Sequence, residues 1–230
     1  MILENVIGDL LAYKGLEPGT FQHVDQITTE RRDNLGLRNQ CFYTADGELY
    51  TVQKGKHLCV ITREPQNLVL ENIDEAYRQL TGQGNYFPDV EAAKASLEHE
   101  DSVVLDLKGL ELLRGNDQYG HFVVNPNALN KLNSEQQRAA ERIYGPDKES
   151  FGLNMKMFVE AGRTPTVYVL MPNYVNGTLR DNNEKFLGRA SWLNYFSINS
   201  SFNANDRFVF NRDALRGVPR VIAERRRTKK

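Results

Sequence analysis

The sequence has few of the residues that build metal centres and covalent cross-links. Only two cysteines, Cys41 and Cys59, and four histidines occur among 230 residues. No zinc site can be assembled from so few thiols. Both cysteines fall in segments of strand composition, which favours two buried free thiols, although a disulfide would be geometrically allowed if these strands pair. The histidines are scattered without the spacing of a metal-binding helix, so we expect no metal and no cofactor.

Charge of one sign and long apolar runs are also lacking. The 29 Lys and Arg residues are balanced by 30 Asp and Glu residues, which gives a net charge of −1. Such a chain has no global positive field to attract phosphates, so nucleic acid is not an expected partner. No run of about 20 apolar residues is present, and the N-terminal stretch lacks the leader and cleavage site of a signal peptide. We therefore expect neither membrane insertion nor a secretion signal.

What is present is an ordinary globular composition, with 40% hydrophobic and 26% charged residues, and this argues against intrinsic disorder. Short strand-like and helix-like segments predict an α+β fold. An Asp46-Gly47 turn between residues 41–44 and 49–52 predicts a β-hairpin. A capping box beginning at Ser134 predicts a helix that ends at Gly145. Further helices are predicted at 73–80, 90–97 and 150–160, and further strands at 57–62, 102–107, 121–124, 165–171, 208–210 and 215–222.

One stretch near the C-terminus has an unusual residue composition. Between Asn194 and Asp213 there is no Lys, Glu, Gln, Met or Trp. Codons that end in a pyrimidine cannot encode these five residue types, whereas they can encode all the types that do occur. Randomising the first two bases of asparagine codons would give this composition, with unmutated or silent positions at Asn194, Asn199, Asn203, Asn205 and Asn211.

This stretch resembles the variable region of the target proteins of diversity-generating retroelements. Residues that look constant within it are Arg189, Ser191, Leu193, Phe196, Ser200, Phe202, Ala204, Arg207 and Val209. The Leu215-Arg216-Gly217-Val218 sequence is similar to the family's closing strand, and Arg189-Ala190-Ser191-Trp192 stands where the related formylglycine-generating enzymes have Gly-Gly-Ser-Trp. The resemblance implies a C-type-lectin-like fold in residues 146–230, mounted on an N-terminal or elaborating α+β region, residues 1–145. It also implies a hypervariable ligand- or receptor-binding surface, in a virion or cell-surface setting.

The residues themselves support a binding surface. If Val209 faces the core, strand alternation turns Phe208 and Phe210 outward, and aromatics beside Asn and Ser are typical of evolved binding sites. A protein or another macromolecule on a target surface is the expected partner, and no catalysis is expected. The predicted ligand-binding residues are Asn194, Tyr195, Ser197, Ile198, Asn199, Ser201, Asn203, Phe208, Phe210, Asn211, Arg212 and Asp213. The alternative for this segment is a polar β-meander in which the aromatics are core residues.

A second functional class is a metal-dependent nuclease. Pro88-Asp89, followed by Asp106-Leu107-Lys108, resembles the PD-(D/E)xK arrangement, in which two carboxylates hold Mg²⁺ and a lysine acts on the attacking water. His57 lies two residues from Cys59, but a strand setting for both favours packing over nucleophilic catalysis. Formylglycine-generating chemistry is not expected, because the C-terminal part has no cysteine.

Overall fold

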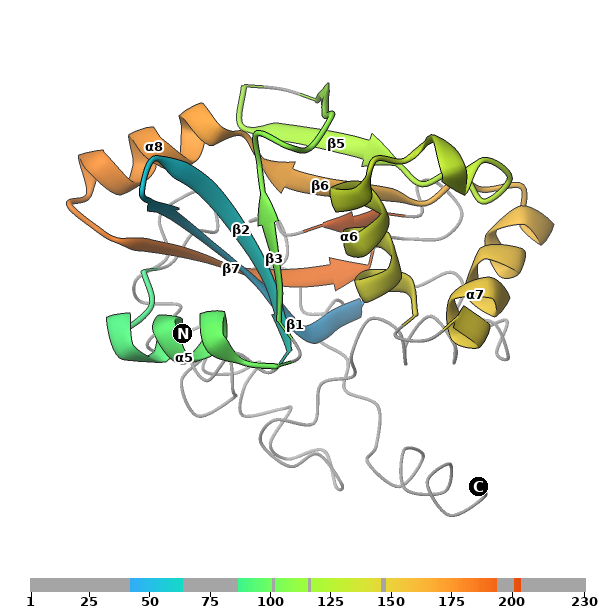
Figure 1. Ribbon diagram of the computed structural model, residues 1–230, viewed down its shortest axis with the longest axis horizontal. Coiled ribbons are helices and arrows are strands. Elements are labelled where there is room, and N and C mark those ends of the chain that lie inside the picture. The colour runs from blue at the N-terminus through green and yellow to red at the C-terminus, as the bar shows by residue number, and fades with distance from the viewer. Residues whose placement is uncertain are drawn as a thin grey trace, which may run out of the picture.

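The computed structural model describes residues 42–63, 87–100, 102–115, 117–145, 148–193 and 201–203. These residues build one eight-stranded sheet with the strand order β3-β2-β1-β7-β8-β6-β5-β4 (Figure 1). The strands are β1 (Phe42–Gln53), β2 (Lys56–Arg63), β3 (Val103–Asp106), β4 (Leu113–Arg114), β5 (Tyr119–Val123), β6 (Thr166–Leu170), β7 (Phe186–Leu193) and β8 (Ser201–Asn203). The helices are α5 (Val90–Glu98), α6 (Ser134–Tyr144), α7 (Lys148–Glu160) and α8 (Pro172–Asp181), with a short 3₁₀ turn η2 (Leu129–Lys131). The predicted helix at 73–80 and the predicted strands at 208–210 and 215–222 lie outside the described residues.

The first hairpin turns at a different place from the one predicted. Its two central residues are Lys54 and Gly55, with φ of 50° and 76°, and positive φ at both positions suits the twist of a two-residue hairpin. The predicted turn at Asp46-Gly47 is wrong, because β1 runs through these residues. Its pairing with β7 shifts register between Tyr43 and Gly47, so the Asp-Gly sequence lies at an irregularity in a long strand instead of ending it.

The helix predicted after residue 134 is present, but its cap lies one residue earlier. The side chain of Asn133 accepts a hydrogen bond from Gln136 N at 2.8 Å, and the Gln136 side chain accepts one from Asn133 N at 3.1 Å. Asn133 also donates its side-chain amide to the carbonyl oxygen of Gly109 at 2.9 Å. Asparagine is as good an N-cap as serine, and its side-chain N–H group also makes the contact with Gly109.

Helix α8 and strand β7 were not predicted. Pro172 was interpreted as the end of the preceding strand, and it is also the first residue of α8, where its missing N–H and fixed φ are tolerated. The long β7 was overlooked because Arg189 and Ser191 interrupt its apolar pattern.

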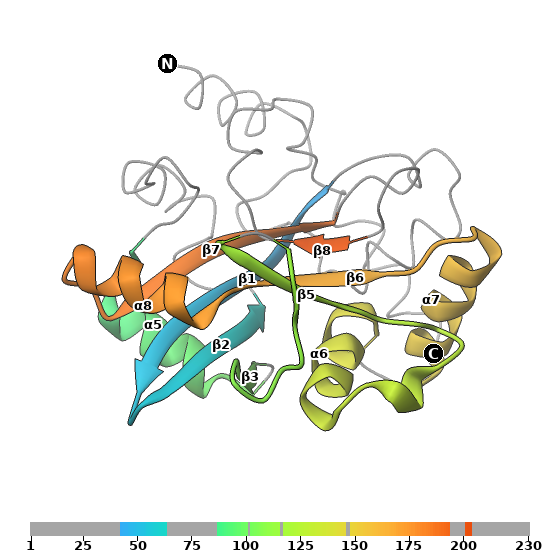
Figure 2. The same cartoon turned by 90° about the horizontal axis from the view of Figure 1, so that it is seen from above.

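Two apolar clusters lie on opposite faces of the sheet, as alternation along β1 shows. Tyr50 belongs to the larger cluster, which takes in buried residues of α6, α7 and α8, whereas Leu49 belongs to a smaller one with Ala93 of α5. Figure 2 shows α6 and α7 together near one end of the sheet, and α5 and α8 near the other. Helix α8 packs on β1, β2 and β7. Strands β1, β2 and β7 therefore carry buried residues on both faces.

The sheet takes strands from both sides of residue 145, where the sequence suggested a boundary. Strand β1 pairs along most of its length with β7, from Phe42 opposite Leu193 to Thr51 opposite Phe186. Residues before and after that boundary therefore share one continuous sheet. None of the described helices has the length and apolar character that crossing a membrane requires.

Candidate ligand-binding face

The predicted binding segment follows β7 along the chain and includes β8. Strand β7 ends at Leu193, and β8 begins at Ser201. Of the predicted ligand-binding residues, Ser201 and Asn203 therefore lie in a strand. The others lie outside the described residues: Asn194, Tyr195, Ser197, Ile198, Asn199, Phe208, Phe210, Asn211, Arg212 and Asp213.

Strand β8 is short and interior. It pairs antiparallel with β7, with Asn203 opposite Trp192 and Phe202 opposite Leu193. On its other side it pairs parallel with β6, with Phe202 opposite Val167. The backbone on both sides of residues 194–200 is thus fixed by the same sheet, which sets where this segment begins and ends.

Side chains make a second connection between the two halves of the sheet near the C-terminal end of β6. The backbone N–H of Leu170 donates a hydrogen bond to the Tyr50 hydroxyl oxygen at 3.1 Å, although Tyr50 belongs to β1. The Tyr50 hydroxyl in turn donates to a carboxyl oxygen of Glu48. Glu48 lies directly opposite Arg189 of β7 in the β1–β7 register.

Arg189 extends this cluster to β5. Its guanidinium donates to the hydroxyl of Tyr119 and lies over the tyrosine ring, 5.1 Å from the ring centroid, an arrangement that combines a hydrogen bond with a cation–π contact. The sequence predicted Arg189 to be a constant scaffold residue, and its side chain is 0% exposed. We call Glu48, Tyr50, Arg189 and Tyr119 the buried polar cluster.

Burial sets the protonation behaviour of this cluster. Glu48 is 1% exposed, and desolvation raises the pKa of its carboxyl to about 7, against the opposing effects of the Tyr50 hydrogen bond and the Arg189 charge. Burial likewise raises the pKa of Tyr50 and of the Cys59 thiol on the adjacent strand. Sequence reasoning missed Glu48 and Tyr50. A glutamate within the apolar alternation of a strand was the available signal.

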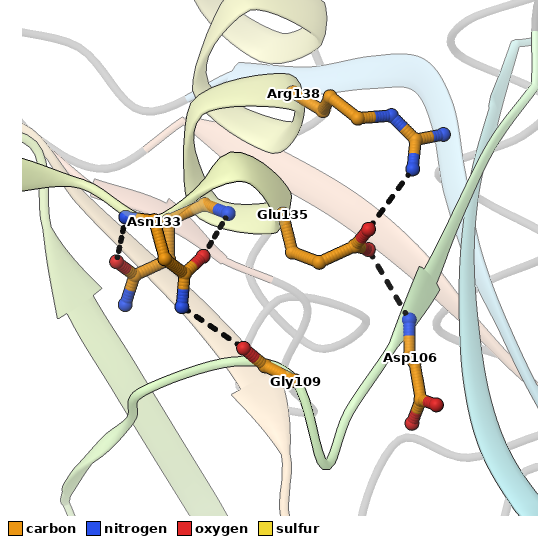
Figure 3. Close-up of polar contacts among 6 residues, drawn as sticks. Asp106, Gly109, Asn133, Glu135 and Arg138 are labelled. Atoms are coloured by element: carbon orange, nitrogen blue, oxygen red, sulfur yellow. Dashed lines mark hydrogen bonds and ion pairs between the residues drawn. The ribbon is translucent and has the colours of Figure 1, made fainter.

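The residues of the nuclease hypothesis are occupied in local backbone contacts. The Asp89 carboxylate caps α5 by accepting hydrogen bonds from Glu91 N and Ala92 N, both at 3.0 Å. The Asp106 carboxylate accepts from the N–H of Lys108 at 3.1 Å, while the Asp106 backbone N–H donates to Glu135 at 3.4 Å, the contact drawn in Figure 3. Within the described ranges, no three His, Cys, Asp or Glu side chains are grouped so that they could hold a metal ion.

Figure 3 also shows what this region does in the fold. Asn133 at the start of α6 donates to Gly109, and Glu135, which accepts from Asp106 N, pairs with Arg138 at 3.1 Å. The beginning of α6 is thereby tied to the loop after β3. These contacts therefore hold α6 in place in the fold.

The other groups considered for chemistry are also placed by the structure. Cys59 is a buried free thiol in β2. His121 stacks on Tyr168 with their ring centroids 5.2 Å apart. His99 is an exposed residue at the C-terminus of α5. Cys41 and His23 lie outside the described residues.

No protein-family model and no curated protein matches the sequence. A solved structure, described as showing the accommodation of massive sequence variation in Nanoarchaeota by the C-type lectin fold, is similar with a TM-score of 0.53 and 12% sequence identity. The match covers 85% of this chain and 85% of that one. The chain therefore has the C-type lectin fold, which confirms the predicted α+β class and fold. The likeness extends over more of the chain than the segment after residue 145.

Proposed function

We propose that this chain is a retroelement-diversified binding protein, in which a C-type lectin scaffold presents a hypervariable surface formed by residues of the 194–213 segment. The observation that carries the proposal is a coincidence of two boundaries. The last of the five missing residue types before the segment is Trp192, and β7 ends one residue later, at Leu193. The composition therefore changes within one residue of the end of this scaffold strand, as expected if only residues beyond the scaffold are rewritten.

The register of β8 supports a division of this segment into fixed and variable positions. Opposite positions on adjacent strands share a face of the sheet, and position 202 lies opposite Val167, which is fully buried. Strand alternation then assigns positions 201 and 203 to the other face. This agrees with the sequence-based division, in which Phe202 is constant while Ser201 and Asn203 vary.

The energetic reason for such a division is general. Truncating a buried large apolar side chain costs about 2–5 kcal/mol, whereas most surface substitutions change stability by less than about 0.5 kcal/mol. A binding protein can therefore tolerate wide variation only at outward positions. Tyr195, Phe208, Phe210 and Arg212 are of the residue types that dominate binding energy at interfaces, and we propose them as its anchors.

The expected ligand is a protein or another macromolecule on a target surface. The segment supplies aromatic residues for contact area and Asn and Ser for adaptable hydrogen bonds. The chemistry is recognition without bond making or breaking. A virion or cell-surface location follows only from the resemblance to retroelement targets, and it is part of the proposal.

The gene sequence tests this function directly. Every variable position from Asn194 to Asp213 should use a codon that ends in C or T, and a near-copy of the segment with asparagine codons at those positions should lie nearby. Purine-ended codons at the proposed positions would exclude adenine-directed rewriting. As a biochemical test, a library randomised at positions 195, 197, 198, 201 and 203 should remain folded in most members, whereas one randomised at 187, 189 and 202 should not.

A further inference from the structure

Strands β4, β5 and β6 bring a row of side chains together on one face of the sheet. Phe122 of β5 and Val167 of β6 are buried in the larger apolar cluster, and they lie opposite each other in the strand register. Because successive side chains of a strand point to opposite faces, the residues next to them belong to the other face. There, Leu113 of β4 lies opposite His121 of β5, and His121 lies opposite Tyr168 of β6.

The side chains of this row are more exposed than their neighbours, and they are apolar or aromatic. The rings of His121 and Tyr168 stack with their centroids 5.2 Å apart. Leu113 is 59% exposed, and Val123, which follows His121 by two residues and shares its face, is 39% exposed. We call Leu113, His121, Val123 and Tyr168 the outer patch. A cluster of exposed apolar surface is typical of an interaction site, whereas single exposed apolar residues are common everywhere.

The charges in this region determine which kind of partner the outer patch fits. None of its four residues is Lys, Arg, Asp or Glu. Arg114, the neighbour of Leu113 in β4, donates to the carboxylate of Asp117 at 2.6 Å, so these two charges are paired with each other. The patch therefore offers no cation to a phosphate or an acidic peptide. An apolar or aromatic side chain of another protein fits it better, because such a group covers Leu113 and packs against the stacked rings.

The outer patch shares its face with two of the predicted variable positions. Thr166, two residues before Tyr168, belongs to the same face and lies opposite position 201 of β8, and position 203 alternates to that face as well. The strand order is β8-β6-β5-β4, and neighbouring strands are about 4.8 Å apart, so β4 lies about 14 Å from β8. A standard interface of about 800 Å² per partner is about 30 Å across. A protein ligand centred on positions 201 and 203 therefore covers the outer patch too.

We propose that the outer patch is a constant part of the ligand-binding face, and that it takes an apolar or aromatic side chain of a protein ligand. This inference rests on the proposed function, and it adds a contact that the rewritten segment does not supply. Positions 201 and 203 then discriminate among ligands, whereas Leu113 and Tyr168 supply contact area that every version of the chain keeps. The ligands of different versions should accordingly share an exposed apolar side chain where they meet Tyr168.

Binders selected from a library of the full chain test the patch. The library is selected against lysozyme and, separately, against serum albumin, and its randomised positions are 195, 197, 198, 201 and 203. Leu113→Ser is then introduced into several unrelated binders of each target. It should weaken binding about tenfold and leave the melting temperature unchanged, because Leu113 is exposed.

The matched control is Leu153→Ser, which changes an exposed leucine of α7. Buried residues of α7 pack into the cluster that contains Phe122 and Val167, so α7 lies on the face opposite the outer patch. The affinity of the selected binders should therefore be the same with and without Leu153→Ser.

Substitutions of Tyr168 separate contact area from a structural role. Tyr168→Phe keeps the ring and its stacking on His121 and should bind within about threefold of the parent, whereas Tyr168→Ala should bind at least about tenfold more weakly. If Leu113→Ser and Tyr168→Ala both leave the dissociation constants unchanged, binding is confined to the variable positions. The proposal is then overturned, while the proposed function stands.

Other outcomes overturn the proposal as well. A melting temperature that falls by several degrees in Leu113→Ser would mean that the chain itself covers this leucine. A dimer of the unliganded chain that Leu113→Ser converts into monomers would mean that a second copy occupies the patch. A library that gives no binder to either target counts against the proposed function, and the inference falls with it.

Discussion

The two sides of strand β7 are built very differently. Toward β1, it is paired along most of its length, from Thr51 opposite Phe186 to Phe42 opposite Leu193. Toward β8, it pairs at Trp192 and Leu193 only, among the described residues. The β1–β7 ladder fixes most of the length of β7, whereas the β7–β8 ladder holds β8 through two residue pairs of the described residues. If residues 194–213 are rewritten as we propose, both ladders are needed, because the segment must be anchored to the scaffold without becoming part of its core.

The buried polar cluster joins β7 to β1 and β5 through Arg189. Disrupting it should cause the largest loss of stability. Arg189→Met removes the positive partner and leaves the Glu48 carboxyl buried without a counter-charge. We expect a loss of about 3–5 kcal/mol in the free energy of unfolding at pH 8, measured by urea denaturation. Arg138→Met, which removes an exposed partner of Glu135, should cost about 1 kcal/mol or less. Equal effects of the two variants would show that the buried polar cluster contributes no more to stability than an exposed ion pair.

Truncating a buried side chain of β7 should cost more stability than substituting a residue of β8. Leu187 is 0% exposed in the large cluster, so Leu187→Ala should destabilise the protein by about 2–5 kcal/mol. Ser201→Tyr in β8 should change stability by no more than about 0.5 kcal/mol if position 201 faces outward. Thermal and urea unfolding of both variants measure the contrast. A large loss in Ser201→Tyr would move that position into the core and remove it from the binding surface.

Global stability should depend on pH through Glu48. The pKa of its carboxyl is raised from 4.5 to about 7 on folding, so the native state binds the proton more tightly than the unfolded state. The contribution of Glu48 is therefore fully present below pH 4.5 and is lost as pH rises to 7. The loss between pH 5 and 8 is roughly 2–3 kcal/mol. Comparing the pH dependence of unfolding in wild type and Glu48→Gln isolates this carboxyl, and a wild type with the same profile as the variant would contradict the assignment.

A smaller effect than those of Arg189→Met and Leu187→Ala is expected at the start of α6, among the contacts shown in Figure 3. Asn133→Ala removes the N-cap of α6 and its contact with Gly109, and should cost about 0.5–2 kcal/mol. Asn133→Ser keeps the capping oxygen and should recover most of that loss.

Local signals predicted many elements and failed where one signal has two structural uses. The helices ending at Gly145 and Gly162 were found because a glycine stop is unambiguous in a helical pattern, and Gly162 has the expected positive φ of 62°. Asp46-Gly47 and Pro172 were misinterpreted. An Asp-Gly pair can lie at a strand irregularity as well as in a turn, and a proline can begin a helix as well as end a strand.

The predicted binding segment was singled out through its composition, and the buried polar cluster was not predicted at all. Residue composition can be read from the sequence alone, so residues 194–213 could be singled out without knowing their positions in space. Glu48 and Arg189 are 141 residues apart in the sequence, and neither is unusual until the β1–β7 register places them opposite each other. No local pattern contains that register, so the cluster could not be predicted.

The sequence by itself determined the α+β class and most of the helices and strands up to residue 170, and it singled out a segment of restricted composition from Asn194 to Asp213. Propensities, caps and residue vocabulary are local and need no partner. Tertiary structure alone decided that residues before and after 145 share one sheet and that β8 is inserted between β7 and β6. It also decided that burial raises the pKa of Glu48 to about 7. The physical reason is that strand pairing and burial depend on segments distant along the chain, and only their packing removes the Glu48 carboxyl from water.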